Sequence, residues 1–89
     1  MSKWISVEER LPDIHIPRND EVVKEWDMSE PVLVYCEEPA SFSKCHMFTA
    51  YYNKITVDTV KYEWYEALYD EIVHPVAWMP LPLPPEALS

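Results

Sequence analysis

The sequence predicts an α+β fold that is mostly β: a small antiparallel meander of three or four strands, with short N-terminal helical turns and a C-terminal polyproline-like tail. Segments rich in β-branched and aromatic residues, bounded by proline and polar residues, predict the strands. A serine cap near the N-terminus and one short apolar pattern with helical spacing at residues 22–26 predict the helical turns. The 89 residues, of which 48% are hydrophobic, suit a single domain at 1–89.

Two helical turns are predicted before the first strand. Ser6 can cap a single turn, because a serine oxygen accepts a hydrogen bond from the backbone at a helix start, and Pro12 ends it. Asp20 can cap a second, short helix that reaches Trp26, since the apolar residues there are spaced as on one helix face. Helices of about two turns are marginal in isolation. The alternative for residues 13–30 is therefore an irregular loop that Trp26 anchors.

Four strands are predicted in the remainder, at residues 31–37, 44–53, 60–67 and 73–79. The first two are joined by a link of hairpin length at 38–43. The third is ambiguous, because residues 57–68 also carry apolar side chains at helical spacing, but their β-branched and aromatic residues favour a strand. Pro75 marks the fourth as an edge strand. The proline tract at 80–85 then predicts an extended chain that packs on Trp4 and ties the two ends together.

The complete absence of glycine excludes several kinds of site. Phosphate-binding P-loops and dinucleotide-binding motifs need glycine for tight turns and for close approach of the backbone to the ligand. The common two-residue hairpin turns also need residues that tolerate positive φ. Turns in this chain must therefore use Pro, Asn, Asp and Ser, and we expect the nine prolines to mark many of the turns and strand ends.

The chain is strongly acidic, with 16 Asp and Glu against seven Lys and Arg and a formal net charge of -9. Phosphate backbones and anionic lipids repel such a surface, so we expect no direct binding to nucleic acid or membranes. A basic protein surface would be attracted, although excess acid can also serve solubility alone. No apolar run approaches the ~18 residues of a membrane span, and no signal-peptide core is present. With two cysteines only, too few for a disulfide scaffold, the expected location is the cytoplasm.

No catalytic or metal-binding constellation is expected. The metal-capable residues do not have the spacing of a zinc site; they are His15, His46, His74, Cys36 and Cys45. Cys45 and His46 are neighbours on a predicted strand and so point to opposite faces, which argues against a catalytic dyad. Cys36 and Cys45 could meet across the hairpin as a disulfide or half a metal site, or else pack as two buried thiols. The sequence predicts a protein that is not an enzyme and that holds no cofactor.

The densest acidic cluster in the second half of the chain spans the third predicted strand and the segment that follows it, with tyrosines interleaved. Rigid aromatic side chains with a charged rim are typical of protein interfaces. On a strand, Glu63 and Tyr65 would share one face while Trp64 points into the core. The alternative is a solvated acidic face with half-buried tyrosines that bind nothing. We expect a basic partner surface to be bound by Glu63, Tyr65, Glu66, Tyr69, Asp70 and Glu71.

The two ends of the chain carry a recognisable pattern. Residues 4–12 read W-I-S-V-E-E-R-L-P, residues 31–34 read P-V-L-V and residues 77–85 read A-W-M-P-L-P-L-P-P. This pattern resembles a small uncharacterised family, a domain of unknown function in tailed bacteriophages and enterobacterial prophages, with an opening W-I-S-V-x-x-R-L-P and a closing H-W-M-P-L-P-x-P-P. Ala77 stands where the family has histidine, and the nearest histidine is His74. The resemblance implies a phage or prophage origin and a host-cytoplasm setting, and it implies no reaction.

Two classes of function remain open. The first is a phage or prophage accessory protein that binds a host protein and inhibits it, for example a nucleic-acid-handling or defence protein. The second is a small-ligand-binding or metal-binding domain that sequesters its ligand and could be oligomeric. A homodimer through an open strand edge or a tyrosine-rich face is compatible with both, since a meander this small leaves its edges exposed.

Overall fold

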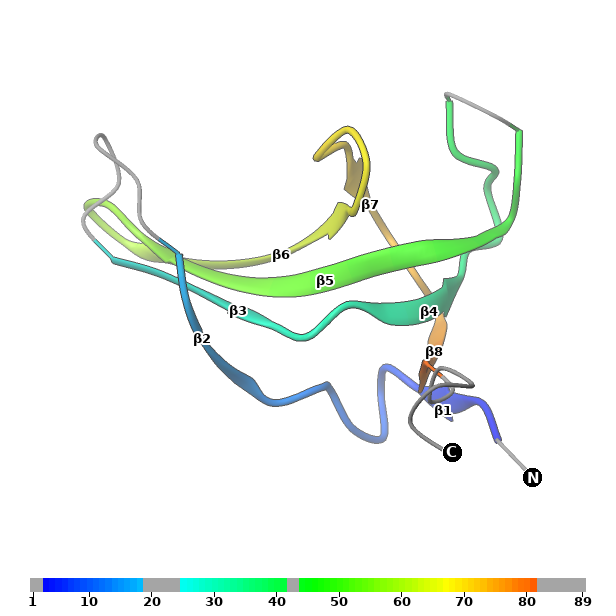
Figure 1. Ribbon diagram of the computed structural model, residues 1–89, viewed down its shortest axis with the longest axis horizontal. Coiled ribbons are helices and arrows are strands. Elements are labelled where there is room, and N and C mark those ends of the chain that lie inside the picture. Colours follow the sequence, from blue (N-terminus) through cyan, green and yellow to red (C-terminus); the bar gives the residue numbers. More distant parts are fainter. Residues whose placement is uncertain (1–2, 19–24, 42–43, 82–89) are drawn as a thin grey trace, which may run out of the picture.

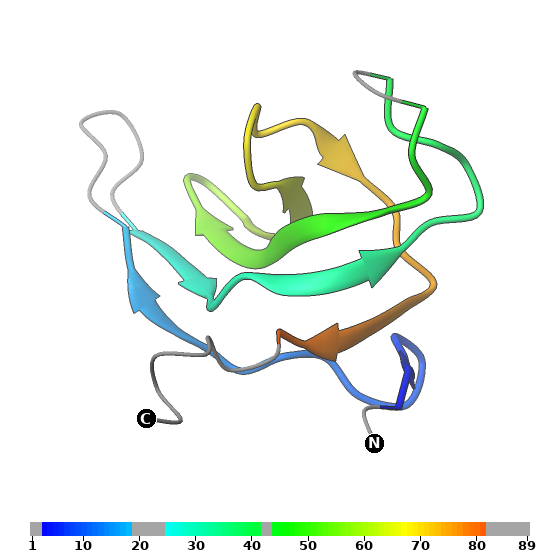
Figure 2. The ribbon, with the colours of Figure 1, turned by 45° about the vertical axis from the view of Figure 1, so that its right-hand side comes forward.

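The described residues form one antiparallel sheet and contain no helix (Figure 1). The computed structural model describes residues 3–18, 25–41 and 44–81. The strands are β1 (Ile5–Ser6), β2 (Ile14–Pro17), β3 (Glu25–Ser29), β4 (Val32–Tyr35), β5 (Met47–Thr56), β6 (Val60–Glu66), β7 (Ile72–Val73) and β8 (Ala77–Pro80). Figure 2 shows the sheet curled into a half-barrel. The predicted α+β class, with helical turns and a simple meander, is therefore wrong, and the fold is all-β.

β5 is the longest strand and organises the sheet. One of its edges pairs with β6 along residues 50–56, and its other edge is shared by β4 and then β3. β3 and β4 act as one long strand that is broken at Glu30 and Pro31, because proline has no N–H for the ladder. At the break, the buried Ser29 side chain takes the place of a backbone acceptor on the neighbouring strand. Its Oγ accepts a hydrogen bond from the Tyr52 N–H at 2.9 Å. The break also adds one residue to this side of the ladder, as a β-bulge does, which increases local twist.

The hydrophobic core lies on one face of the sheet, where β4, β5, β6 and β8 meet. Val34 and Ala50 are fully buried at its centre, as the alternation along the two predicted strands requires. Trp64 and Trp78 pack around them from β6 and β8, and Val73 adds to the cluster from β7. Complete burial of each large apolar side chain stabilises the fold by about 1.5–3 kcal/mol. This cluster is therefore the main source of stability in the described chain.

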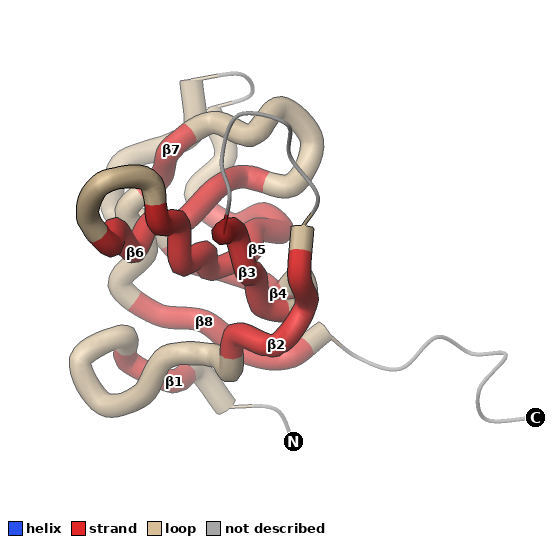
Figure 3. Tube along the Cα trace, turned by 90° about the vertical axis from the view of Figure 1, so that its left-hand side faces the viewer, coloured by secondary structure: helices blue, strands red, loops and turns tan. Residues whose placement is uncertain are grey.

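The ends of the described chain are joined by strand pairing. β1 pairs with β8, with Ile5 opposite Trp78, and Figure 3 shows the two strands side by side at one end of the curled sheet. The Trp78 Nε1–H donates to the Arg10 carbonyl at 2.8 Å, which fixes the turn after β1 over the core. Trp4 lies outside the core: it is 39% exposed and meets the Tyr35 ring edge-on. The tie between the two ends therefore depends on Trp78 and the β1–β8 pairing.

The predicted helical turns are replaced by a turn and a strand. The Ser6 Oγ accepts a hydrogen bond from the Glu8 N–H at 3.2 Å, and the Ser6 carbonyl accepts one from the Arg10 N–H at 3.2 Å. These bonds make a single turn that is too short for a helix. Trp26 lies in β3, where it pairs with a residue of β5, so the helix predicted to reach it is wrong at that residue. Its predicted start at Asp20 lies outside the described residues.

The strands predicted at 31–37, 44–53 and 60–67 are found as β4, β5 and β6. The single strand predicted at 73–79 is wrong, because the buried Pro75 separates β7 from β8. The proline tract predicted to pack on Trp4 lies outside the described residues from position 82 onward.

Candidate functional site

Four of the six predicted interface residues lie together in the segment that runs from the last residue of β6 to the start of β7, here called the β6–β7 loop (residues 66–71). The loop is closed by two backbone hydrogen bonds, from the Asp70 N–H to the Glu66 carbonyl at 2.9 Å and from the Glu66 N–H to the Glu71 carbonyl at 2.8 Å. Asp70 has a φ of 56°, in the left-handed region that favours glycine. Aspartate is one of the residues that tolerate this region, so a chain without glycine can still make the turn.

Glu66 holds the loop from inside. Its side chain is among the largest that are fully buried, and the residue is 2% exposed. Its carboxylate accepts hydrogen bonds from the Leu68 N–H at 2.8 Å and from the Tyr69 N–H at 2.6 Å. Charge-assisted bonds of this kind are the strong ones. Glu66 therefore supports the predicted interface from below and does not form part of its outer surface.

Asp70 anchors the loop to a distant part of the sheet. Its carboxylate accepts a hydrogen bond from the Tyr51 hydroxyl on β5 and another from Arg18 Nη2 at 3.3 Å. Arg18 also donates through Nη1 to the Tyr51 hydroxyl oxygen at 2.8 Å, and its guanidinium lies 4.1 Å from the centre of the Trp26 ring. Burial raises the pKa of Tyr51, and the hydrogen bond to Asp70 raises it further. The loop is thus fixed to the β2–β3 hairpin through charged and aromatic contacts.

Glu63 and Tyr65 share one face of β6, as predicted, while Trp64 is buried in the core on the other face. The Tyr65 hydroxyl donates to Glu63 Oε2 at 2.9 Å. The Tyr65 ring also packs edge-on against the Tyr51 and Trp26 rings, with centroids 6.2 and 5.9 Å away. Burial, reinforced by the hydrogen bond to Glu63, raises the pKa of Tyr65 to about 12. These two predicted interface residues therefore lie beside Tyr51 and Trp26, the two side chains that Arg18 contacts.

Deprotonation of Tyr65 is expected to destabilise the protein as the pH rises from 10 to about 12. In the unfolded chain the tyrosine pKa is about 10. Over this range the folded state keeps a proton that the unfolded state has lost, so the free energy of unfolding falls with rising pH. We expect a fall of about 1–2 kcal/mol, after allowance for solvent screening of a partly exposed group.

Urea denaturation across this pH range, with tyrosinate absorbance followed in parallel, measures the effect. Tyr65→Phe should reduce the slope of stability against pH. Equal slopes in the native protein and in Tyr65→Phe would contradict this expectation.

The exposed residues of this region are mainly apolar. Leu68 is 77% exposed, Tyr69 is 69% exposed and Ile72 is 51% exposed. The sequence interpretation included Tyr69 but missed Leu68 and Ile72. A usable signal was present, because a large apolar residue in a short loop between two strands has no core to enter and connecting loops carry many binding residues.

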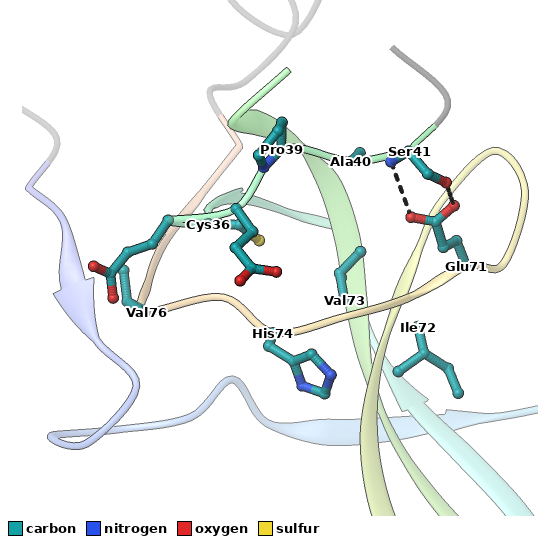
Figure 4. Close-up of a pocket in the computed structure, with 11 residues that line it drawn as sticks. Cys36, Pro39, Ala40, Ser41, Glu71, Ile72, Val73, His74 and Val76 are labelled. Atoms are coloured by element: carbon teal, nitrogen blue, oxygen red, sulfur yellow. Dashed lines mark hydrogen bonds between the residues drawn. The ribbon is translucent and has the colours of Figure 1, made fainter. Parts of the chain in front are cut away.

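A cavity of about 420 Å³ opens beside this loop, between residues 36–41 and residues 71–76 (Figure 4). We call it the loop cavity. The Glu71 carboxylate accepts hydrogen bonds from the Ser41 N–H at 3.3 Å and from the Ser41 hydroxyl, and these bonds join the two walls. Glu71 is therefore a structural contact that also belongs to the lining of the cavity.

The thiol and imidazole groups near this cavity do not form a nucleophilic pair. Cys36 is 3% exposed; its burial raises the pKa of the thiol, and a hydrogen bond from the His74 backbone partly opposes this. Figure 4 shows the His74 ring directed away from the Cys36 sulfur. Cys36 is buried, Cys45 is exposed, and the two do not form a disulfide. Within residues 3–18, 25–41 and 44–81, no group of three or more His, Cys, Asp or Glu side chains could hold a metal ion.

Comparison with known proteins places the chain in one family. No match was found among curated proteins or among solved structures. In the part of the chain that the structure describes, no helix has the length and apolar character needed to cross a membrane. The expectation of a domain of unknown function, drawn from the two ends of the sequence, is confirmed. A family model described as Protein of unknown function (DUF551) matches residues 3–86, and the chain therefore belongs to that family.

Proposed function

We propose that the protein acts by binding another protein through the β6–β7 loop and the residue that follows it. One observation carries this proposal: Leu68 and Tyr69 are 77% and 69% exposed at the tip of a loop that internal bonds hold in place. A few residues supply most of the binding energy in protein interfaces, and tyrosine is one of the types enriched among them; apolar neighbours such as leucine help to exclude water. Ile72, 51% exposed just after the loop, extends the same contact surface.

The loop is prepared for binding because its acidic side chains are anchored. The Glu66 carboxylate accepts hydrogen bonds from two backbone N–H groups of the loop. The Asp70 carboxylate accepts them from Tyr51 and Arg18, and the Glu71 carboxylate accepts one from Ser41. A surface that is already ordered loses little conformational entropy when it binds. The acids thus have a different part from the one expected from the sequence: they fix the loop, and the apolar residues between them make the contact.

The partner in this proposal is a protein of a bacterial host, such as a nucleic-acid-handling or defence protein, that a phage or prophage product binds and inhibits in the host cytoplasm. The motifs at the two ends of the sequence support the phage origin. The net charge of -9 supports a partner with a basic surface, since long-range attraction raises association rates.

Replacement of the two tip residues tests the contact surface. The double variant Leu68→Ser/Tyr69→Ser is expected to bind a host protein captured from bacterial lysate at least about tenfold more weakly, because it removes two exposed anchors. The captured protein is identified by mass spectrometry, and its affinity for each variant is measured by calorimetry.

Val57→Ser/Val60→Ser is the matched control. These residues are 63% and 50% exposed at the far end of β5 and β6, so the control also removes exposed apolar side chains but away from the loop. Its affinity should equal that of the native protein. Equal losses in the two double variants, or no loss in the tip variant, would remove the β6–β7 loop as the contact surface.

A further inference from the structure

We propose that the loop cavity receives one arginine side chain of the bound protein. This inference rests on the proposed function and adds the chemistry of the partner: a segment in which an arginine lies next to apolar residues. The cavity volume of about 420 Å³ lies in the lower part of the range of small-ligand pockets, which is about 300–1,000 Å³. It is wide enough for a single long side chain.

The floor of the cavity suits the aliphatic stem of such a side chain. Cys36, Ala40 and Val73 line it and are 3%, 3% and 7% exposed. Ile72 and Val76 add apolar surface nearer to solvent. Arginine is amphipathic, because its methylene groups pack on apolar surface while the charged head stays near water. A small inorganic cation would gain nothing from this floor.

The rim of the cavity suits the guanidinium head. Three carboxylates line the cavity, those of Glu37, Glu38 and Glu71, and no lysine or arginine is among its described lining residues. Glu37 and Glu38 are exposed, so a guanidinium beside either of them stays partly hydrated and avoids the cost of burying a charge. The planar guanidinium binds carboxylates through two parallel hydrogen bonds and is more weakly hydrated than an ammonium group. Arginine therefore fits this rim better than lysine.

The position of the cavity connects it to the proposed contact surface. Ile72 lines the cavity and is also part of the exposed apolar surface, and Glu71 belongs to both the cavity and the β6–β7 loop. A partner segment that covers Ile72 together with the loop therefore lies against the lining of the cavity. One partner segment can therefore use both features at once.

The test uses two small probes that differ in charge and not in shape. The full chain, labelled with ¹⁵N, is titrated with Nα-acetyl-arginine amide and, separately, with Nα-acetyl-citrulline amide, whose urea group is neutral. We expect the arginine probe to shift the amide signals of Ala40, Val73 and His74, with a Kd of about 1–10 mM, as suits a ligand of this size. The citrulline probe should bind at least about threefold more weakly, since it lacks the charge that the carboxylates attract.

Two acid-pair variants locate the site. Glu37→Gln/Glu38→Gln should weaken binding of the arginine probe at least about threefold. Glu8→Gln/Glu9→Gln removes the same charge from the exposed turn after β1 and should leave the Kd unchanged. Since all four residues are exposed, both variants should fold normally.

Three results would overturn the inference: no shifts at the cavity amides, equal binding of the two probes, or equal weakening in the two acid-pair variants. The proposed function is judged separately. Leu68→Ser/Tyr69→Ser should still bind the arginine probe like the native protein, because neither residue lines the cavity. Loss of partner binding in that variant therefore tests the contact surface, and the probe titration tests the cavity.

Discussion

Replacement of Trp78 by alanine is expected to lower the free energy of unfolding by about 4 kcal/mol. Trp78 is 4% exposed, and β8 holds it between Ile5 of β1 and Val34 of β4. Truncation leaves a cavity in the centre of the core that the paired strands on both sides cannot close. A chain of this size has a total stability on the order of 5 kcal/mol. Urea denaturation followed by far-UV circular dichroism should therefore show a variant that retains only about 1 kcal/mol and unfolds at low urea concentration.

Two further substitutions separate packing from the hydrogen bond. Trp78→Phe keeps much of the apolar area but removes the bond to the Arg10 carbonyl, so we expect a loss of about 1–2 kcal/mol. Trp4→Ala should cost under about 1 kcal/mol, because Trp4 is 39% exposed and touches only the edge of the core strands. If Trp4→Ala proved as costly as Trp78→Ala, the placement of Trp4 outside the core would be wrong.

The long strands could be predicted because their information is local. Residues 32–35, 47–56 and 60–66 combine β-branched or aromatic residues with alternation of period two, and this pattern also places Trp64 and Ala50 on the core side. The first two of these strands are consecutive in the chain and pair with each other, as the predicted link of hairpin length at 38–43 implied, although the observed connection is longer and runs over residues 36–46. Composition and pattern therefore specified both the strands and their pairing.

The short strands could not be predicted in the same way. β1 and β7 have two residues each, which is too few for any periodicity. β3 carries Trp26 in a segment with spacing that suits a helix equally well, and only its pairing with the far half of β5 decides in favour of a strand. Pairing between segments distant in sequence is a tertiary property. The α+β prediction failed because it gave these local helical patterns a weight that non-local pairing overrides.

The candidate site shows the same difference between features set by local sequence and features set by distant contacts. The sequence identified the acidic, tyrosine-rich cluster as one region, since its residues are close together in the chain. The part that each acid plays depends on partners far away: Asp70 bonds Arg18, and Glu71 bonds Ser41. Neither pairing leaves a local pattern in the sequence. The burial of Glu66 was likewise hidden, because glutamate is rarely buried unless it is paired.

Replacement of Glu66 by alanine is expected to lower the free energy of unfolding by about 3 kcal/mol. The substitution removes two charge-assisted hydrogen bonds, each worth about 1.5–3 kcal/mol, and leaves the Leu68 and Tyr69 N–H groups without their acceptor. Water can reach these partly buried groups once the side chain is gone, which keeps the loss at the lower end of the sum. Glu66→Gln should cost about 1–2 kcal/mol, because one amide oxygen can replace only one of the two carboxylate acceptors.

Chemical denaturation measures these losses, with Glu63→Gln as the control from the same strand. The Glu63 side chain is partly exposed and accepts its hydrogen bond from the Tyr65 hydroxyl, so its loss should cost under about 1 kcal/mol. Near-native stability in Glu66→Ala would contradict the anchoring role of the carboxylate.

The same substitution links the stability of the loop to binding. Glu66→Gln keeps the contact residues Leu68 and Tyr69 but loosens the backbone that carries them, so the partner has to order the loop when it binds. Hydrogen exchange at the two amides should accelerate in Glu66→Gln, and affinity for the partner should fall together with protection, although no contact residue has changed. A loss of protection without any loss of affinity would show that the loop binds equally well when it is disordered, and the argument from preorganisation would then fail.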